Sequence, residues 1–312
     1  MTKSKISILT PTYNEEKNIL ELHKAVRSEM VSLNDKYEYE HIIIDNNSRD
    51  KTIELAKAIA NEDKNFKIIC NARNFGSPRS QAHGLFQSEG DAVILMAADF
   101  QDPPELIKKY VEKWEKGSEI VLAKKKSSDE NFLMWKFRNI FYKFINLISE
   151  TPLHINTSGA GLYDKSVINK LKTIEDPCPY IRGLVSELGF KIDIVEHHQP
   201  RRLRGKTKEN FLTYYDTAIL GIVKHSKLPL RLMTIIGFFT SILSIIIALV
   251  FFIYKLFYWD SFELGVAPLI IGIFGIGAIQ IFLLGLIGEY IGVLLTHVRK
   301  LPLVIEKERI NF

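Results

Sequence analysis

The chain has 312 residues, 46% of them hydrophobic and 25% charged, and 41 Lys and Arg against 36 Asp and Glu give a net charge of +5. This length is typical of one domain with an appendage, and the small, dispersed positive excess suits anionic substrates or an anionic membrane surface but argues against nucleic acid as a partner. Cys70 and Cys178 are the only cysteines, which argues against a disulfide framework or a zinc site and indicates thiols in a reducing compartment. The first residues, soon interrupted by Pro11, are not expected to form a signal peptide.

Short apolar runs alternate with helical patterns along the first part of the chain. Residues 6–10, 41–44, 66–70 and 93–96 are predicted strands, and helical spacing follows them over 15–30, over 52–59, up to Leu85 and from Pro104. This alternation predicts βαβ units and a mainly parallel sheet whose strands all deliver polar loops to one edge. None of the strands is followed by Gly-x-Gly-x-x-Gly or by a P-loop, which excludes the dinucleotide-binding and P-loop classes.

The fourth predicted strand leads directly into two carboxylates. Asp99 and Asp102 follow residues 93–96, in a turn that Pro103 and Pro104 stop. Ligands of open α/β sheets bind at the carboxyl ends of the strands, and hard divalent cations that bridge phosphates prefer carboxylate oxygen. The turn therefore indicates a metal–diphosphate site. An acidic loop that caps the helix beginning at Pro104 is the alternative.

Four motifs in this part of the chain carry a resemblance to a known family. They are Pro-Thr-Tyr-Asn-Glu at 11–15, Asp-Asn-Asn-Ser at 45–48 with Asp50 and Thr52, Arg-Asn-Phe-Gly at 73–76, and Ala-Asp-Phe-Gln-Asp-Pro-Pro-Glu at 98–105. In this order and spacing they resemble glycosyltransferase family 2. The resemblance is greatest to its polyprenyl-phosphate glycosyltransferases, which include dolichyl-phosphate mannose synthase and bactoprenol glucosyltransferases, and it covers nearly the whole chain. It implies a GT-A fold, a nucleotide-diphospho-sugar donor and inversion at the anomeric carbon.

The resemblance also implies roles for individual residues. The expected nucleotide-sugar contacts are Pro11, Tyr13, Glu15, Asp45, Arg73 and Asp99. Asp99 would bind Mg²⁺ or Mn²⁺ on the diphosphate, and Asp102 would be a second ligand or would support Asp99, so both are candidate catalytic residues. Many relatives have Asp-x-Asp where this chain has Ala97. Weakened or lost metal dependence is therefore the alternative. Asn46 replaces another common Asp and keeps an acceptor.

Two basic segments are candidates for the acceptor side. Residues 132–148 have apolar and basic side chains on opposite faces, which suits a helix in the membrane interface or one packed on the domain core; the resemblance favours the membrane, with Arg138 as a phosphate ligand. Residues 199–208 are the densest basic cluster, in which Arg204 and Lys208 match cations of the relatives. A solvated loop or an anionic-lipid patch is the alternative there. His197 and His198 lack the spacing of a metal site.

The last third of the chain contains two long apolar segments. Residues 232–257 and 267–295 are long enough to cross a bilayer, and the basic residues lie before the first and after the second. This predicts a membrane hairpin in contact with lipids, with the catalytic domain and both ends in the cytoplasm, and the resemblance implies that the membrane is the bacterial cytoplasmic membrane. Gly288 and Gly292 form a Gly-x-x-x-Gly motif that favours a homo-oligomer.

Together these observations predict the organisation of the whole chain. The expected fold is α/β, a GT-A catalytic domain with a Rossmann-like, mainly parallel sheet and a transmembrane helical hairpin. The expected parts are a domain over 1–210, a juxtamembrane helix over 211–230, the hairpin over 231–298 and a cytoplasmic tail over 299–312. The reaction that the resemblance implies is inverting transfer of a hexose, from UDP-glucose or a related UDP-sugar, to undecaprenyl phosphate. The alternatives are a family 2 transferase with a polysaccharide or protein acceptor, and a catalytically impaired nucleotide-sugar-binding scaffold.

Overall fold

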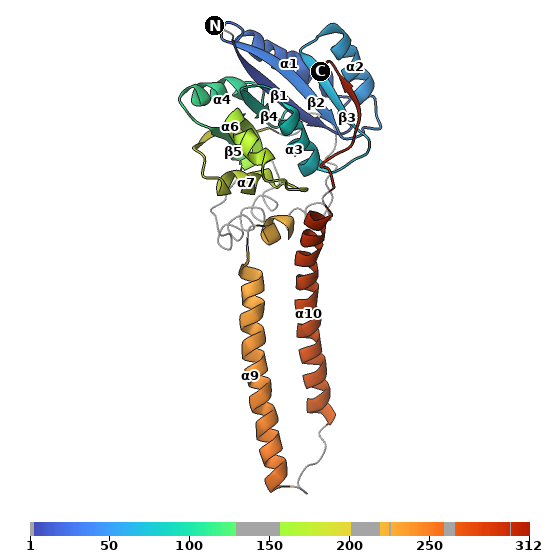
Figure 1. Ribbon diagram of the computed structural model, residues 1–312, viewed down its shortest axis with the longest axis vertical. Helices are drawn as coiled ribbons and strands as arrows, with labels where there is room; N and C mark the ends of the chain where they lie inside the picture. Colours follow the sequence, from blue (N-terminus) through green and yellow to red (C-terminus); the bar gives the residue numbers. More distant parts are fainter. Residues whose placement is uncertain (1–2, 129–156, 201–218, 225, 259–265, 300) are drawn as a thin grey trace.

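The computed structural model describes residues 3–128, 157–200, 219–224, 226–258, 266–299 and 301–312 (Figure 1). A sheet with helices on both faces forms one part of the molecule, and two long helices project from one end of it. The expected interfacial helix with Arg138 and the basic segment with Arg204 and Lys208 lie outside the described residues. Within the expected juxtamembrane helix, residues 219–224 are helical.

The first half of the described chain alternates strands and helices as predicted. Its elements are β1 (Ser4–Thr12), α1 (Ile19–Val31), β2 (Tyr37–Asp45), α2 (Thr52–Glu62), β3 (Phe66–Asn71), α3 (Ser77–Gln87), β4 (Ala92–Leu95) and α4 (Leu106–Glu115). The later elements of this domain are β5 (Ile120–Ser128), β6 (Thr157–Asp164), α6 (Lys165–Lys172), α7 (Ile181–Glu187) and β7 (Ile192–Gln199). The chain continues with α9 (Leu228–Phe257), α10 (Val266–Val298) and β8 (Glu306–Ile310).

The strands form one sheet in the order β7-β5-β6-β4-β1-β2-β3-β8. β1 pairs in parallel with β2 and β4, β2 with β3, and β5 with β7, whereas β6 and β8 run antiparallel to their neighbours. The register places Thr12 opposite Asp45 and Leu9 opposite Leu95. The predicted α/β fold with a mainly parallel, Rossmann-like sheet is confirmed, and the ends of β1, β2 and β4 meet at one edge.

Both faces of the central strands are buried, which explains their continuous apolar runs. On one face Ile6 and Ile8 pack in a cluster with residues of α1 and α4, and α2 packs over β2 and β3. On the other face Leu9 and Ile44 pack in a cluster with residues of α3, α6 and α7. The sheet is therefore a rigid platform that fixes where each polar loop begins.

Strand β6 is built from a glycine-rich segment that the sequence analysis does not identify as a strand. A Cβ added at Gly161, whose φ is +146°, would lie 2.1 Å from the backbone oxygen of Val121 in β5. A side chain at this position would separate the two strands. Gly161, a residue that is unusual in strands, is thus the residue that lets β5 and β6 pair.

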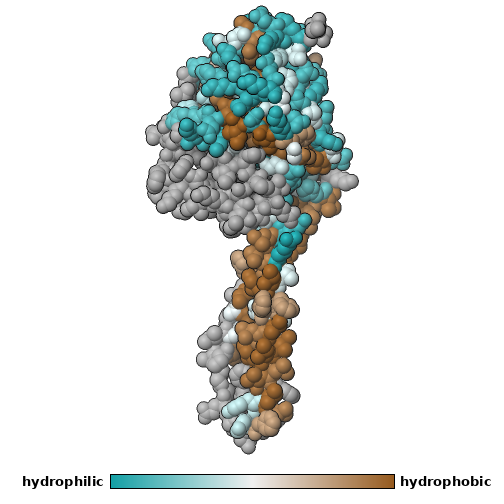
Figure 2. Space-filling view, turned by 90° about the vertical axis from the view of Figure 1, so that its left-hand side faces the viewer, coloured by the Kyte–Doolittle hydropathy of each residue, from teal (hydrophilic) through white to brown (hydrophobic). Residues whose placement is uncertain are grey.

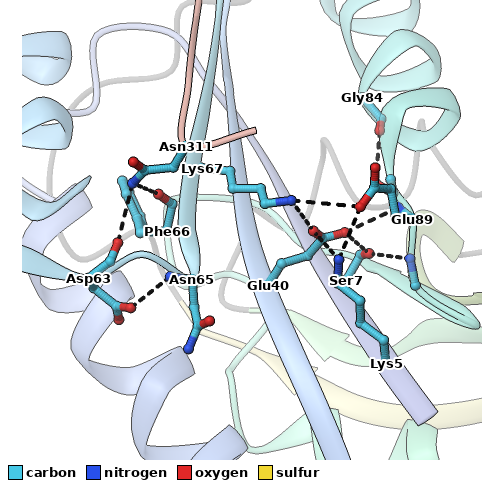
Figure 3. A network of polar contacts seen from close by, with 12 residues as sticks. Lys5, Ser7, Glu40, Asp63, Asn65, Phe66, Lys67, Gly84, Glu89 and Asn311 are labelled. Carbon is cyan, nitrogen blue, oxygen red and sulfur yellow. Dashed lines mark hydrogen bonds and ion pairs between the residues drawn. The ribbon is translucent and has the colours of Figure 1, made fainter. Parts of the chain in front are cut away.

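A charged group surrounds the buried Glu40 near the amino ends of the strands, and we call it the amino-edge cluster: Lys5, Ser7, Glu40, Lys67 and Glu89 (Figure 3). The Glu40 side chain is 2% exposed, and both lysine ammonium groups lie 2.7 Å from its Oε2. The Ser7 hydroxyl and the Glu89 backbone N–H donate to its Oε1. Burial raises the pKa of Glu40, but these partners outweigh burial and hold it at about 2.

The two apolar segments form the long helices α9 and α10, as predicted. They contain 30 and 33 residues, or roughly 45 and 50 Å at 1.5 Å per residue, against about 30 Å for the hydrocarbon core of a bilayer. Their large apolar side chains are exposed along most of the described length, in contrast to the hydrophilic surface of the sheet domain (Figure 2). Both helices are long and apolar enough to cross a membrane.

The segment after α10 differs from the expected tail, because it returns to the sheet. Strand β8 pairs antiparallel with β3, with Ile310 opposite Ile68. The Asn311 amide donates to the backbone oxygen of Phe66, as Figure 3 shows, and also to that of Ala60. Residues 306–310 are mostly charged, so no apolar pattern marks the strand. Backbone pairing, polar contacts and the packing of Ile310 on the core hold it at the edge.

Candidate active site

The loops that follow β1, β2, β3 and β4 lie at the carboxyl edge of the sheet, where ligands of open α/β folds bind. The register brings the last residues of β1 and β2 together, with Pro11 opposite Ile44 and Thr12 opposite Asp45. β4 ends at Leu95, and the Met96 N–H still bonds to the Leu9 carbonyl. The turn with Asp99 therefore starts beside the loop that leaves β1.

Asp45 organises the space between the ends of β1 and β2. Its side chain accepts hydrogen bonds from the Thr12 hydroxyl and from the backbone N–H and hydroxyl of Ser48. The Ser48 hydroxyl in turn accepts from the backbone N–H of Asn14, which has a φ of 55°. Asp45 is 1% exposed, and this burial raises its pKa although the hydrogen bonds lower it. Asp45 thus fixes both loops.

A second set of contacts holds the loop after β1 against the start of α2. The Glu15 backbone N–H donates to the Thr52 hydroxyl, and the Glu15 carboxylate accepts from the Asn18 amide. Asp50 accepts from the Thr52 hydroxyl and N–H. Tyr13 is half-buried in the same loop. The predicted donor residues Pro11, Tyr13, Glu15 and Asp45 therefore lie in two interlocked loops.

Side-chain amides join the loop after β3 to this arrangement, and we call Asn46, Asn71 and Asn74 the amide network. The Asn46 amide nitrogen donates to Asn74, and its oxygen accepts from Asn71 and from the Phe75 N–H. Asn74 Oδ1 also accepts from the Gly76 N–H. Asn46 thus both donates and accepts, whereas the Asp that is common in relatives could only accept. The Asn of this chain is therefore part of what joins the two loops.

The loop after β3 presents two arginines around one aromatic ring. The guanidinium of Arg73 lies 4.0 Å from the centre of the Phe75 ring, and that of Arg79 lies 5.6 Å from it. Arg79 also donates to the backbone oxygen of Pro302, beyond α10. Arg73 itself is exposed, so its charge faces the solvent at the carboxyl edge.

The two carboxylates of the turn after β4 have different surroundings. Asp99 is half-buried, its Oδ1 accepts from the Gln101 N–H, and the next residue, Phe100, has a φ of 61°. Asp102 is 4% exposed, and its Oδ1 lies 3.4 Å from Nε2 of His197 in β7. Asp99 therefore lies toward the loops of the carboxyl edge, whereas one Asp102 oxygen faces the interior.

The described residues contain no group of three or more His, Cys, Asp and Glu that could enclose a metal ion. The Asp99 carboxylate still suits Mg²⁺ or Mn²⁺, because such ions keep several waters and commonly take one or two protein carboxylates together with substrate phosphates. The donor chemistry thus fits an ion that arrives with a diphosphate. The predicted acceptor ligands Arg138, Arg204 and Lys208 lie outside the described residues.

The structure adds residues that the sequence analysis misses. Thr12, Ser48 and Asn74 each bond to a predicted site residue or to the amide network. Thr12 and Ser48 stand inside the quoted motifs, so the motifs themselves were the signal. His197 carries no comparable signal, because its contact with Asp102 joins segments that are distant in the sequence.

Comparisons with known proteins agree with this geometry. Residues 7–172 match the family model of glycosyl transferase family 2. The chain is 33% identical over 305 residues to the bactoprenol glucosyl transferase of Shigella phage SfII, covering 97% of this chain and 98% of that protein. It is also 33% identical over 300 residues to the uncharacterized glycosyltransferase YkcC of Bacillus subtilis, covering 96% and 92%.

Among solved structures, the mannosyltransferase PcManGT of Pyrobaculum calidifontis, in complex with GDP-Man and Mn²⁺, superimposes with a TM-score of 0.50 at 15% identity. The similarity covers 72% of this chain and 64% of that one. At this level of identity the likeness is one of fold, and it agrees with the layered, mainly parallel sheet described above.

Proposed function

The chain belongs to glycosyltransferase family 2 and has the predicted GT-A fold, and from this premise we propose that it transfers a hexose, with inversion, from a nucleotide-diphospho-sugar to a polyprenyl monophosphate. UDP-glucose or a related UDP-sugar is the proposed donor, and undecaprenyl phosphate is the proposed acceptor. Bactoprenol glucosyl transferases that align with nearly the whole chain support a glucosyl group and a polyprenyl acceptor, and the choice of UDP rests on the resemblance of the sequence to bacterial undecaprenyl-phosphate enzymes.

One observation carries the proposal: the carboxyl-edge site and two exposed apolar helices are joined in one chain. The loops around Asp45 and Asp99 suit a polar donor, and α9 and α10 are long enough to cross a bilayer. A water-soluble acceptor would not require such helices. An acceptor with a lipid chain and a phosphate at the membrane surface explains both parts of the molecule.

On the donor side we assign each residue a role. The loops with Pro11, Tyr13, Glu15 and Asp45 would hold the nucleoside, and exposed Arg73 would approach the donor. Asp99 would hold Mg²⁺ or Mn²⁺, with Asp102 as a second ligand or as support. When bound, the ion supplies positive charge to the departing nucleoside diphosphate. Asp99 thereby contributes orientation and charge.

The acceptor needs no dedicated general base. A phosphate monoester with a second pKa of about 6 is largely ionised near neutral pH, so its oxygen is already a nucleophile. The protein must instead balance the charge of two phosphate groups and hold them in line. Arg138, Arg204 and Lys208 are proposed for this task on the acceptor side.

The proposed location is the bacterial cytoplasmic membrane, with the sheet domain and both ends of the hairpin in the cytoplasm. Lys224, Lys227 and Arg231 precede or begin α9, and basic residues also follow α10. Gly288 and Gly292 have no described atom within 4 Å of an added Cβ. This open Gly-x-x-x-Gly face supports the proposal that two or more copies associate.

The direct test is transfer of label from a panel of radiolabelled nucleotide sugars into organic-extractable lipid. Membranes containing the protein are supplied with undecaprenyl phosphate and with Mg²⁺ or Mn²⁺. We expect label in the lipid from one donor, and its loss in Asp99→Asn but not in the control Asp35→Asn, whose exposed side chain lies before β2. Donor binding that depends on the metal, with no transfer from any donor, would instead support the scaffold alternative.

A further inference from the structure

Beneath the Asp99 turn lies a group of titratable side chains that we call the buried trio: Asp102, Tyr110 and His197. Asp102 lies just before α4, Tyr110 is in α4, and His197 is in β7. The side chains of His197 and Asp102 are 4% and 6% exposed, and Tyr110 is 1% exposed. Three polar groups from two elements and a turn thus converge in the domain core.

Burial of the three polar side chains of the trio lowers the stability of the fold. Within the part of the chain that the structure describes, Asp102 Oδ1, the Tyr110 hydroxyl and both ring nitrogens of His197 have no hydrogen-bond partner. Buried polar atoms are normally paired, and an unpaired one lowers stability. Burial and then the charge of Asp102 raise the pKa of Tyr110, so its hydroxyl stays neutral. An apolar group of the same size would stabilise the core more, which indicates a functional reason for the trio.

The position of the trio suggests that reason. Asp102 is separated from Asp99 by Phe100 and Gln101, and from α4 by a short segment with Pro103 and Pro104. His197 lies opposite Lys125 in the β5–β7 ladder, just before β7 ends at Gln199. The Asp102–His197 contact therefore ties the turn that carries Asp99 to the strand that leads toward residues 201–208.

We propose that His197 is a positioning residue for the transfer reaction: it donates to Asp102 and so fixes the turn in which Asp99 faces the donor. This inference rests on the proposed function and makes it more specific, because it assigns Asp102 to support of the turn rather than to the metal. The 3.4 Å between Nε2 and Oδ1 is slightly longer than a hydrogen bond. Contacts in ligand-free sites commonly shorten when substrate binds.

Substitutions of His197 test the contact. His197→Leu fills the buried position with an apolar side chain that cannot donate. His197→Gln can reach Asp102 with its amide, whereas the amide of His197→Asn is too short to do so. We expect kcat to fall about tenfold or more in His197→Leu and His197→Asn, with donor KM little changed, and His197→Gln to recover most of the loss. The control His198→Leu changes the exposed neighbour and should retain wild-type kcat.

Binding of Mn²⁺ in the presence of UDP, followed by the electron paramagnetic resonance of free Mn²⁺, tests the role of Asp102 without turnover. Asp99→Asn should weaken binding about tenfold or more, whereas Asp102→Asn should stay within about threefold of wild type. In the double variant His197→Leu with Asp102→Asn, kcat should fall no further than in His197→Leu alone, because the two residues act as one unit.

Several results would overturn the inference. Equal kcat for His197→Leu and wild type would remove the positioning role, and so would a better kcat for Leu than for Gln, which indicates that only packing matters. Loss of Mn²⁺ binding in Asp102→Asn would make Asp102 a ligand. If His197→Leu does not fold, the Gln and Asn variants decide the matter. If the wild type transfers no sugar, the proposed function fails, yet the Mn²⁺ comparison still judges Asp102.

Discussion

At the amino edge of the sheet the Glu40 carboxylate meets two lysine ammonium groups at 2.7 Å, whereas at the carboxyl edge Asp45 accepts from Ser48 and Thr12. Both carboxylates are almost fully buried. The pKa of Glu40 is held at about 2 despite burial, while burial raises that of Asp45. The same sheet thus contains one carboxylate balanced by cations and one whose hydrogen bonds leave its charge poorly balanced.

This difference shows how one scaffold separates stability from function. Charge at the amino edge is neutralised within the fold, so little is left for a ligand. Charge at the carboxyl edge is held by neutral donors in the loops that follow the strands, which suits a site that receives a metal and a diphosphate. Substitutions at the two edges should therefore change different measurable quantities.

The largest effect is expected at the carboxyl edge. Asp99→Asn should lower transfer of sugar to lipid by about 10²–10³-fold, because the neutral amide holds a divalent cation poorly. The thermal unfolding midpoint should stay near that of wild type, since Asp99 is only half-buried. Wild type and Asp99→Asn are compared by initial rates of transfer at saturating donor and by thermal unfolding of the same preparations. A large loss of stability would instead indicate that Asp99 stabilises the fold, as Glu40 does.

The next effect belongs to the amino edge and concerns stability. Since the pKa of Glu40 falls from 4.5 to about 2 on folding, its ionised form stabilises the fold above pH 4.5, and this contribution is lost as the pH falls toward 2. At 1.36 kcal/mol per pKa unit the contribution is on the order of 3 kcal/mol. Glu40→Gln should therefore lower stability at pH 7 and flatten the acid dependence below pH 4.5.

Unfolding of wild type and Glu40→Gln in detergent, measured between pH 7 and pH 3, checks this prediction. Transfer per folded molecule should be unchanged in the variant. If the stability of the two proteins falls equally with pH, the low pKa of Glu40 is contradicted. If Glu40→Gln loses transfer but not stability, the two edges do not differ in the way described.

A smaller effect is expected in the amide network. In Asn46→Asp a carboxylate oxygen would face the oxygen of Asn74, and turning Asn74 over would deprive the Gly76 N–H of its acceptor. One of these contacts must be lost, at about 1–2 kcal/mol, which loosens the loop that presents Arg73. Isothermal titration should show UDP binding weakened about fivefold to thirtyfold, whereas the exposed control Asn34→Asp should bind as wild type does.

The smallest effect is expected where β8 closes the sheet. Asn311→Ala removes the amide that donates to the carbonyls of Ala60 and Phe66, which should cost about 1 kcal/mol and lower the unfolding midpoint by about 2–4 °C. Hydrogen exchange should accelerate in β8 and β3 but not in β1. The exposed control Lys307→Ala should leave both measurements unchanged.

The fold was predictable where hydrophobic pattern and secondary structure coincide. Strands β1 to β4 lie under helices on both faces, so they read as apolar runs, and the helices between them keep an apolar stripe. Strand β6 was missed because Gly159 and Gly161 are poor strand formers that serve close packing. Strand β8 was missed because its charged side chains lie at an exposed edge.

The candidate site was predictable only where a motif is local. Thr12 and Ser48 lie inside the quoted motifs, and Asp99 lies in the turn that follows β4. The contact between Asp102 and His197 depends on how α4 crosses β7, which no local pattern encodes. Sequence spacing argued against a metal site at His197 and His198, and it could not reveal that Asp102, from another element, contacts His197.

The return of β8 to the sheet also bears on how the chain is made. Because β8 follows α10, a ribosome must complete both long helices before the edge of β3 can receive its last partner. Until then the nascent domain exposes unpaired backbone groups of β3, the kind of edge that invites pairing with other chains. Completion of the sheet therefore waits for both long helices, and a delay in making them would prolong the stage at which β3 is most prone to aggregation.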